Sequence, residues 1–385
     1  MRRVKIALTH LRHAKSGGTE RYLNQLAVFL AERDWEVEIV CRRHGEPPHP
    51  RVRFRRLHGF ALGHSWRVLS FARSVERLHR SGEFDVVFGL GRTWSQDVVR
   101  LGGGLTTTFL ESMRAEGDRT PVVAKGRQRV NLEIERRNFD PPRAQRVIAN
   151  SHMVARDLAA RYDVDPENVD VVHNGVDLER FDATRYTSAR EEIRRAAGIE
   201  GEAPTLLFLG TGYVRKGLPK ALEAFALARR ERKELRMLVA GFDSSGVDWT
   251  ARARELSCAD AVHFAGGTDR PEHYFAAADA YVLPTRYDPF ANSTLEALAS
   301  GLPTLTTPTN GGCEVVTPGV DGEVLGVDAP AADWAAALLH HLDPAHLPES
   351  RAAARATAER NGIGARLADT ERILLEVARR RGASN

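Results

Sequence analysis

Short apolar runs alternate with amphipathic segments along the first half of the chain. Five runs rich in Val, Ile and Leu are typical of strands buried on both faces: 4–10, 37–41, 84–90, 145–151 and 169–177. Between the first two, residues 19–35 place Leu23, Leu26 and Leu30 on one face of a helix. Strands that alternate with helices predict a parallel sheet.

The same pattern begins again in the second half. Residues 205–217 are a strand followed by a loop, and further strands are predicted at 235–241, 261–267, 278–285 and 302–307. Pro219 suits the first turn of the helix that follows the loop. We therefore predict an α/β chain of two Rossmann-like, doubly wound domains that face each other across a cleft. Ligands of such sheets bind beyond the carboxyl ends of the strands.

The predicted domains are 1–180 at the amino terminus and 181–363 at the carboxyl terminus. An amphipathic helix is predicted at 364–385. Its pattern is compatible with packing on either domain, and we predict that it packs back on the first. A length of 385 residues with 42% hydrophobic content is enough for two ordinary cores.

Nothing in the sequence suggests a membrane span or secretion. No stretch approaches 18 apolar residues, and the apolar run near the basic start is too short for a signal peptide. The three cysteines are scattered, which favours neither a disulfide framework nor a metal site. The expected location is the cytoplasm, with a peripheral position on the inner face of the cell membrane left open.

Charge is divided unevenly between the halves. Residues 1–180 hold 31 Lys and Arg against 23 Asp and Glu, a formal charge of +8, whereas the remainder holds 24 against 28, a charge of −4. The excess suggests an anionic partner for the first half. An arginine-rich genome would produce the same imbalance without a functional reason.

The stretch RYDPFANSTLEALASGLP carries two acids, Asp288 and Glu296, with seven residues between them. One interpretation is structural, because Ser293-Thr294-Leu295-Glu296 matches a helix capping box and Asp288 precedes a proline in a turn. The other interpretation is a ligand site, in which both carboxylates accept hydrogen bonds from hydroxyl groups.

Three glycine loops follow predicted strands. The first, 16–21, contains Gly17 and Gly18, and the second, 210–217, contains Arg215 and Lys216, a pair suited to a diphosphate. The third, 309–314, should lie near the D-x7-E stretch in space. None is a Walker A or dinucleotide fingerprint. A tight turn at 16–18 and a solvated cation pair at 215–216 are the alternatives.

Together these motifs carry a resemblance to a known family. VRKG after a strand, D-x7-E in YDPFANSTLEALASGLP, TPTNGGCEVVTPGVDGEVL, GGTERYLNQLAVFLAERDWEVEIVC and VVHNGVDLERF resemble the retaining, nucleotide-sugar-dependent glycosyltransferases of the GT-B fold, specifically glycosyltransferase family 4. GLGRTWSQDVVRLGGG and GTGYVRKG further resemble the lipopolysaccharide-core glucosyltransferases that act on heptose.

The resemblance implies roles for particular residues. Asp288 would face the sugar hydroxyls, Glu296 the ribose, and Arg215 and Lys216 the leaving diphosphate. The remaining donor-binding positions implied are Gly17, Gly18, Phe290, Ala291, Asn292 and Ser293. Here Asp288 stands where the family usually has Glu, which shortens the reach toward the sugar. UDP-glucose is the favoured donor, and GDP-mannose and UDP-GlcNAc stay open.

The first half is expected to bind a glycan or glycolipid acceptor. Asp97, in the loop after strand 84–90, is a candidate acceptor contact and catalytic residue, with a solvated loop acid as the alternative. A basic segment is expected to face the acceptor or an anionic membrane surface through Lys125, Arg127, Arg129, Arg136 and Arg137, or else to be a solvated helix face. Asp163 and Asp165 form a D-x-D that we interpret as a turn, so no metal or other cofactor is expected.

Three other classes compete with a glycosyltransferase. A nucleotide-sugar 2-epimerase would need catalytic acids in the first domain, and 10–18 and 89–104 offer no convincing set. A nicotinamide oxidoreductase lacks its fingerprint. A non-catalytic nucleotide-sugar binder would hold a nucleotide without turnover. Nucleic acid is not expected as a partner, because the basic residues lack interleaved aromatics.

Overall fold

The computed structural model describes residues 3–13, 17–59, 62–114, 125–140 and 146–383. The chain forms two compact units. Unit 1 consists of Met1–Glu111, Pro121–His173 and Gly364–Asn385, and unit 2 of Ser112–Thr120 and Asn174–Ile363. Among the described helices, none is long and apolar enough to cross a membrane.

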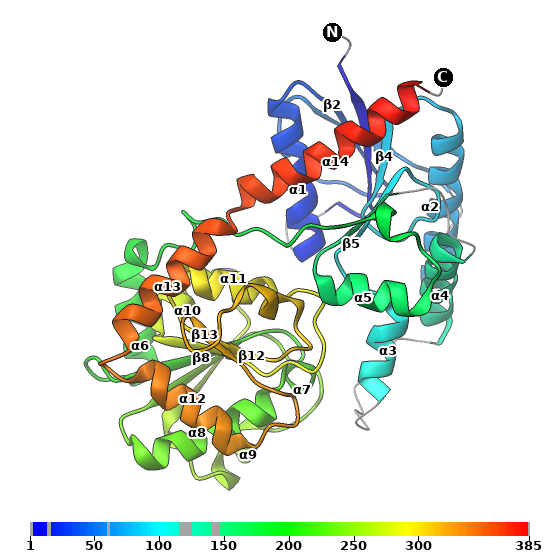
Figure 1. Cartoon of the computed structure of the whole chain (residues 1–385). Helices are drawn as coiled ribbons and strands as arrows, with labels where there is room; N and C mark the ends of the chain where they lie inside the picture. The colour runs from blue at the N-terminus through cyan, green and yellow to red at the C-terminus, as the bar shows by residue number, and fades with distance from the viewer. Residues whose placement is uncertain (1–2, 14–16, 60–61, 115–124, 141–145, 384–385) are drawn as a thin grey trace. The chain divides into compact units, whose positions relative to one another are not determined.

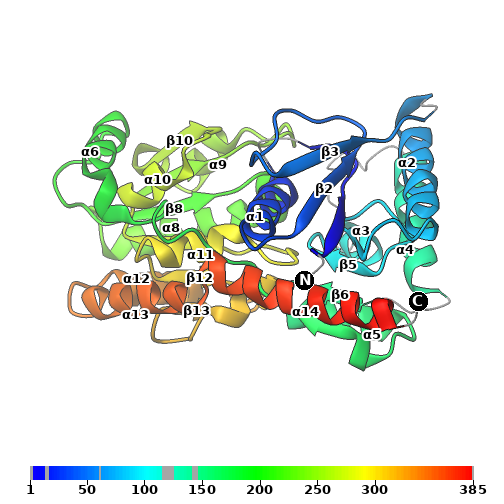
Figure 2. The ribbon, with the colours of Figure 1, turned by 90° about the horizontal axis from the view of Figure 1, so that it is seen from above.

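Unit 1 is built on a parallel sheet in the order β3-β2-β1-β4-β5-β6-β7. Its strands are β1 (Lys5–Thr9), β2 (Glu36–Cys41), β3 (Val52–Arg56), β4 (Val86–Gly89), β5 (Val98–Leu101), β6 (Arg146–Ala149) and β7 (Val169–Val171). Its helices are α1 (Gly18–Glu32), α2 (Gly63–Arg80), α3 (Thr106–Arg114), which runs past the end of the unit, α4 (Lys125–Phe139), α5 (His152–Arg161) and α14 (Ile363–Ala383). Helix α1 lies on one face of the sheet and α2 and α4 on the other (Figures 1 and 2).

Helix α14 packs on unit 1. Tyr22 and Thr370 share a hydrogen bond between their hydroxyls (3.0 Å), and the Trp35 indole donates to Glu371 (2.9 Å). The sequence predicted domain boundaries after residues 180 and 363. In the structure the corresponding boundaries between the units follow His173 and Ile363.

Unit 2 repeats the architecture with a parallel sheet in the order β10-β9-β8-β11-β12-β13. Its strands are β8 (Thr205–Leu209), β9 (Arg236–Ala240), β10 (Val262–Gly266), β11 (Ala280–Leu283), β12 (Thr304–Thr306) and β13 (Gly322–Val324). Its helices are α6 (Thr187–Ala196), α7 (Tyr213–Lys216), α8 (Leu218–Glu231), α9 (Trp249–Glu255), α10 (Pro271–Ala277), α11 (Asn292–Ala299), α12 (Ala331–Leu342) and α13 (Leu347–Arg360). Helices α8 and α12 cover one face and α11 and α13 the other (Figure 1).

The apolar runs form the cores, as their pattern predicts. Leu206, Leu207 and Phe208 of β8 are fully buried, as are Ile6 and Leu8 of β1. Because each sheet is covered by helices on both faces, these strands read as continuous apolar runs rather than as alternating ones. The prediction of two parallel-sheet, Rossmann-like domains is confirmed.

Three strands have no counterpart in the prediction. Strand β3 is an edge strand with the sequence VRFRR, which is rich in arginine, and it is only partly buried. Strand β5 is four residues long and contains Arg100, which stacks on the ring of Tyr22, 3.9 Å from its centroid. Strand β13 is a three-residue edge strand. Each is too short or too polar for hydrophobic periodicity to reveal.

Candidate functional site

In unit 2, two loops meet where β8 and β11 end. The backbone amide of Arg286 donates to the carbonyl of Arg215 (2.9 Å), and the Thr285 hydroxyl donates to the same oxygen (3.2 Å). The loop 210–217, which contains the short helix α7, is therefore joined to the chain that leaves β11. This is the carboxyl edge of the sheet, where ligands of such folds bind.

Close approach of these loops requires glycine at position 217. Gly217 has φ +84°, and a Cβ there would lie 1.9 Å from the carbonyl oxygen of Pro284. Only glycine combines this backbone conformation with that contact. Helix α8 begins directly after it, at Leu218.

Lys216 and Asp288 form a buried ion pair at the centre of this region. The Lys216 Nζ lies 2.5 Å from Asp288 Oδ2, and the lysine is only 7% exposed. Arg215 Nη1 lies 3.4 Å from the same carboxylate oxygen and donates to the carbonyl of Tyr287 (3.0 Å). The structure thus brings together three of the predicted site residues, one acid between two cations.

Burial and charge act in opposite directions on this pair. Burial alone raises the pKa of the Asp288 carboxyl, but Lys216 and Arg215 outweigh burial and hold that pKa below its ordinary value. For Lys216, burial lowers the pKa, and the attraction of Asp288 only partly opposes the shift. Asp288 is therefore ionised near neutral pH, and the charged form of Lys216 depends on it.

Helix α11 begins without the capping box that was the structural alternative for Ser293-Thr294-Leu295-Glu296. It starts at Asn292, and its N-cap residue is Ala291. The side chain of Ala291 makes no hydrogen bond to the first turn of the helix. The structural interpretation of Ser293 as the cap is therefore wrong, because the helix begins one residue before that serine. Its first-turn amides can meet an anionic ligand, which the positive end of a helix favours.

Asn310 in the third glycine loop fixes the start of α11. Its Oδ1 accepts from the amides of Ala291 (3.0 Å) and Gly312 (2.9 Å). Its Nδ2 donates to the hydroxyls of Thr294 (2.9 Å) and Thr306 (3.0 Å). Fully buried, this side chain uses both ends, so the loop and the helix form one unit. The predicted proximity of the glycine loop and the D-x7-E stretch is confirmed.

Asn174 is a second positioning residue, and the sequence-based prediction missed it. Its Nδ2 donates to Asn292 Oδ1 (2.6 Å) at the first residue of α11. The signal available in the sequence was its place in VVHNGVD, just after strand β7.

The remaining predicted residues of unit 2 lie on or beside the same helix. Phe290 and Ala291 are buried, Asn292 and Ser293 are half-buried, and Glu296 is 9% exposed within the helix. The Glu296 carboxylate is among the charges that oppose the effect of burial on the pKa of Lys216, so it lies within electrostatic reach of the ion pair. The D-x7-E acids thus flank the start of α11.

In unit 1, Gly17 and Gly18 begin helix α1. Gly17 is the N-cap with φ +111°, and a Cβ there would lie 2.3 Å from Glu20 Oε2. The glycine therefore lets the chain turn tightly from β1 into α1. Their predicted contact with a donor stays a prediction.

Asp97 lies elsewhere than expected. It precedes β5 at the amino edge of the sheet, whereas the prediction placed it among loops at the carboxyl edge. Its carboxylate accepts from the amide of Val87 (2.7 Å) and from Arg381 Nη1 (2.5 Å), and it lies 3.0 Å from His79 Nε2. These three contacts tie β4, α2 and α14 together and favour a structural role.

The basic residues of α4 divide into two groups. Arg136 and Arg137 pair with Glu133, at 3.1 and 2.6 Å, as in a solvated helix face. Arg127 and Arg129 are less engaged with acids, and Arg127 lines a cavity described below. The side chain of Lys125 and residues 115–124 of the predicted segment lie outside the described residues.

The predicted turn at 163–165 has a structural role. Asp165 Oδ1 accepts from the amide of Glu167 (2.9 Å) and caps a short 3-10 helix, Pro166–Asn168. Both observations match the interpretation of the D-x-D as a turn.

Two family models match the chain in succession. The model described as Glycosyltransferase Family 4 matches residues 16–180, and the model described as Glycosyl transferases group 1 matches residues 189–360. The D-inositol 3-phosphate glycosyltransferase of Streptomyces scabiei is 33% identical over 378 residues, which cover 89% of this chain and 82% of that protein.

Solved structures share the fold. WaaG, a glycosyltransferase involved in lipopolysaccharide biosynthesis, superposes with a TM-score of 0.77 at 21% identity, covering 96% of this chain and 99% of that one. Anabaena HepE in complex with UDP-glucose gives a TM-score of 0.70 at 18% identity, covering 95% and 98%. With two Rossmann-like units and both family models in order, the chain belongs to the family 4 and group 1 glycosyltransferases of the GT-B fold, which transfer a sugar from a nucleotide sugar.

Proposed function

We propose that the protein transfers a glucosyl group from UDP-glucose to a hydroxyl of a sugar or polyol acceptor, with retention of configuration and without a metal ion. Unit 2 binds the donor and unit 1 binds the acceptor. The observation that carries the proposal is the buried cluster of Lys216, Arg215 and Asp288 beside the uncapped start of α11.

Each part of this cluster suits one part of the donor. Two cations and the first-turn amides of α11 match a diphosphate, whose charge grows as the sugar departs. Carboxylates accept hydrogen bonds from hydroxyls, so Asp288 suits the sugar and Glu296 suits the ribose. Asp288 also favours the charged form of Lys216 against the effect of burial, which links sugar recognition to stabilisation of the leaving group.

The chemistry needs no protein nucleophile. The bond between the anomeric carbon and the diphosphate oxygen breaks, and the diphosphate leaves with the electron pair. The acceptor oxygen then bonds to the anomeric carbon on the same face, and its proton passes to the departing phosphate oxygen. Arg215 and Lys216 stabilise the charge that develops on the leaving group.

The named relatives support the choice of substrates. HepE from Anabaena was solved with UDP-glucose, and the Streptomyces scabiei relative is named for an inositol phosphate. WaaG is named for lipopolysaccharide biosynthesis. Because an inositol phosphate and a lipopolysaccharide both carry several hydroxyl groups, we propose a polyhydroxylated acceptor, free or part of a glycolipid.

The test is an assay of nucleoside diphosphate release on the full chain, with UDP measured for UDP-glucose and UDP-GlcNAc and GDP for GDP-mannose, using D-inositol 3-phosphate as the first acceptor. Each donor is assayed with Mg²⁺ and with EDTA, and the anomeric configuration of the product is read by NMR. We expect turnover with UDP-glucose, unchanged by EDTA, and an α-linked product. An inverted product would refute retention, and a 2-epimer formed without acceptor would identify an isomerase.

A pair of lysine variants tests the site itself. Lys216→Ala should lower kcat by about 10²–10³-fold, the usual loss when one preorganised donor of transition-state charge is removed. Lys220→Ala is the matched control, because Lys220 lies on α8 and donates to the carbonyl of Ala329 (2.8 Å). Full activity of Lys216→Ala would exclude the diphosphate role. Donor binding without turnover on any acceptor would favour a non-catalytic binder.

A further inference from the structure

Unit 1 contains a cavity of about 730 Å³ at the carboxyl edge of its sheet. The lining residues follow four neighbouring strands, β1, β2, β3 and β4, or lie on helices α1, α2 and α4. This is the edge at which open α/β sheets bind their ligands. A volume in this range suits a small molecule or the head group of a larger one.

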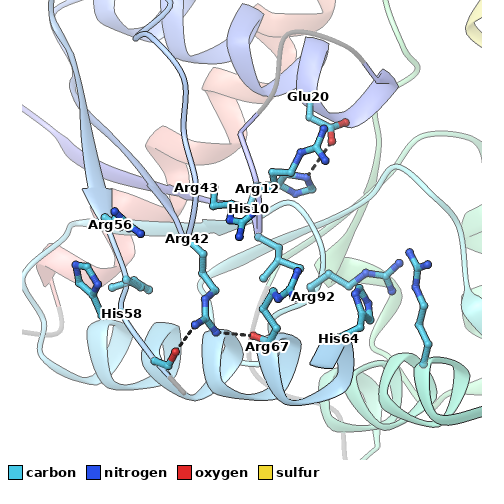
Figure 3. Close-up of a pocket in the computed structure, with 14 residues that line it drawn as sticks. His10, Arg12, Glu20, Arg42, Arg43, Arg56, His58, His64, Arg67 and Arg92 are labelled. Carbon is cyan, nitrogen blue, oxygen red and sulfur yellow. Dashed lines mark hydrogen bonds and ion pairs between the residues drawn. The ribbon is translucent and has the colours of Figure 1, made fainter. Parts of the chain in front are cut away.

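The lining is strongly basic. It includes seven arginines, three histidines and a single acid, Glu20, so its formal charge is +6 with neutral histidines. The arginines are Arg12, Arg42, Arg43, Arg56, Arg67, Arg92 and Arg127. The Glu20 carboxylate lies 3.7 Å from His10 Nε2, and the interaction with His10 lowers the pKa of the acid. Figure 3 shows these side chains around the cavity.

Most of these arginines have no acidic partner among the described residues. Arg42 donates only to neutral oxygens: the carbonyls of Arg67 (3.1 Å) and Gly59 and the hydroxyl of Ser70 (2.6 Å). In the part of the chain that the structure describes, no carboxylate lies within ion-pair distance of Arg43, Arg56, Arg67, Arg92 or Arg127. These charges remain available to a ligand.

Two neighbouring residues of β3 show that the lack of acidic partners is a local property of the cavity. Arg55 pairs with Glu38 (2.7 Å) and Glu83 (2.5 Å), and these carboxylates raise its pKa. Arg56, on the opposite face of the strand, lines the cavity and has no such partner within the described ranges. The sheet therefore compensates its cations on one side and leaves them uncompensated on the other.

The charged side chains of the lining fall into two groups, one around Arg42 and one around His64, and Arg67 acts on both. Burial first, and then Arg67, Arg43 and Arg56, lower the pKa of Arg42. Burial, Arg127, Arg92 and Arg67 lower the pKa of His64 in the same way. In Figure 3, Arg56 and His58 lie at one end of the cavity and Arg92 and His64 at the other, with Arg42 and Arg67 between.

Two further features distinguish the group around His64, which includes Arg92 and Arg127. The Nε2 of His64 is buried and has no hydrogen-bond partner among the described residues. Arg92 has φ +65°, a conformation that non-glycine residues rarely adopt and that clusters at ligand sites. The pKa of Arg92 is also lowered, by burial first and then by Arg127.

We propose that this cavity binds an acceptor that carries at least two phosphate groups, one at each end. A phosphate monoester carries a charge of about −1.5 to −2 at pH 7, so a single phosphate would leave most of the seven arginines uncompensated. Leu11 and Leu57 also line the cavity and can contact the carbon skeleton between the phosphates. The proposal rests on the proposed function, in that it assigns this anion site to the acceptor.

The test compares a sugar bisphosphate with the matching monophosphate by calorimetry at fixed ionic strength. The probes are glucose 1,6-bisphosphate and glucose 6-phosphate, and UDP is titrated in parallel. We expect the bisphosphate to bind at least tenfold more tightly than the monophosphate. Equal affinities would overturn the proposal. Failure of UDP binding alone would overturn the donor assignment and leave this inference standing.

Two double variants test the two ends separately. Arg43→Gln/Arg56→Gln removes charge from one end, and Arg92→Gln/Arg127→Gln removes charge from the other. Each should weaken bisphosphate binding about tenfold and reduce its preference over the monophosphate, without changing UDP affinity. The control is Arg51→Gln/Arg53→Gln, because these exposed arginines lie on or beside β3 outside the cavity. An equal loss in the control would show a non-specific charge effect and overturn the proposal.

Vesicles identify the source of the phosphates. Vesicles with phosphatidylinositol bisphosphate are compared with vesicles of phosphatidylinositol, with glucose 1,6-bisphosphate as competitor. Selective, competed binding supports a lipid head group, and binding of the soluble bisphosphate alone supports a free acceptor. Vesicle binding that the variants do not weaken, or an oligonucleotide that binds as tightly as the bisphosphate, would overturn the proposal.

Discussion

Replacing Asp288 with Asn should destabilise unit 2 strongly, because it leaves Lys216 buried without its counterion. The lysine is 7% exposed, and its Nζ lies 2.5 Å from the carboxylate that would be lost. Removing one partner of a buried ion pair costs about 3–5 kcal/mol. The carboxamide of the variant would still accept from the amide of Phe290, as Asp288 does at 3.2 Å, so we expect the lower end of that range.

The assay is differential scanning calorimetry of the full chain. A loss of about 3 kcal/mol should lower the Tm of the affected transition by roughly 6–12 °C in a domain of this size. The control is Asp260→Asn, which removes an exposed partner of Arg229 at 2.6 Å. That surface pair should contribute less than about 1 kcal/mol.

The pH dependence of the Asp288→Asn variant distinguishes its cause. Burial already lowers the pKa of Lys216, and loss of the opposing carboxylate lowers it further. The folded variant then releases the lysine proton at a lower pH than the unfolded chain does. Because the unfolded state binds more protons there, the stability of the variant rises with pH. The deficit should shrink until the pH reaches the pKa of Lys216 in the wild type, which burial holds below the ordinary value of 10.5.

A double variant isolates the contribution of the ion pair. Asp288→Asn/Lys216→Met removes both charges, and should recover most of the stability while turnover stays lost. If the single variant costs less than about 1 kcal/mol, or if the double variant is no more stable than the single one, the ion pair is not the source of the effect.

Two further substitutions test the framework of each unit. Gly217→Ala should cost more than about 2 kcal/mol and weaken UDP binding, because its Cβ would overlap the carbonyl of Pro284; thermal shift and calorimetry measure both, and an unchanged UDP affinity would contradict the assigned loop contact. Asp97→Asn should lower the Tm by loosening Arg381 and the Val87 amide yet leave the KM for the acceptor unchanged, and a KM that rises with an unchanged Tm would restore the acceptor role.

The sequence was most informative where a site is contiguous. The loop 210–217 and the stretch from Asp288 to Glu296 each follow a buried strand, so strand order alone placed them at one edge of one sheet. The Lys216–Asp288 pair joins residues 72 positions apart, and no local pattern specifies such a contact. The same holds for Asn310, whose hydrogen bonds reach back to Ala291 and Thr294.

The cap of α11 shows how a local pattern can mislead. Ser293 and Glu296 have the spacing of a capping box, and the helix would then begin after the serine. The helix instead begins at Asn292, where Asn174 and Asn310 hold its first residues from outside. Tertiary hydrogen bonds therefore outweighed the intrinsic preference of the serine for a cap.

The arginines that line the cavity follow a pattern in the sequence that can be recognised only once the order of the strands is known. Arg12, Arg42 and Arg92 each follow a strand within three residues, and Arg56 ends another. Singly, each resembles a solvated surface cation. Because the strands after which they stand are neighbours in the order β3-β2-β1-β4, the fold gathers them at one edge.

The two units therefore differ in whether nearby carboxylates compensate the charges of their cations. In unit 2, Asp288 lies between Lys216 and Arg215, so the proposed donor site contains its own compensating charge. In unit 1, one carboxylate faces seven arginines, and mutual repulsion must oppose folding unless an anion is bound. A ligand that supplies several negative charges removes that repulsion, whereas a neutral sugar does not. The imbalance of +8 in the first 180 residues, by itself ambiguous, thus acquires a location and a specific chemical consequence.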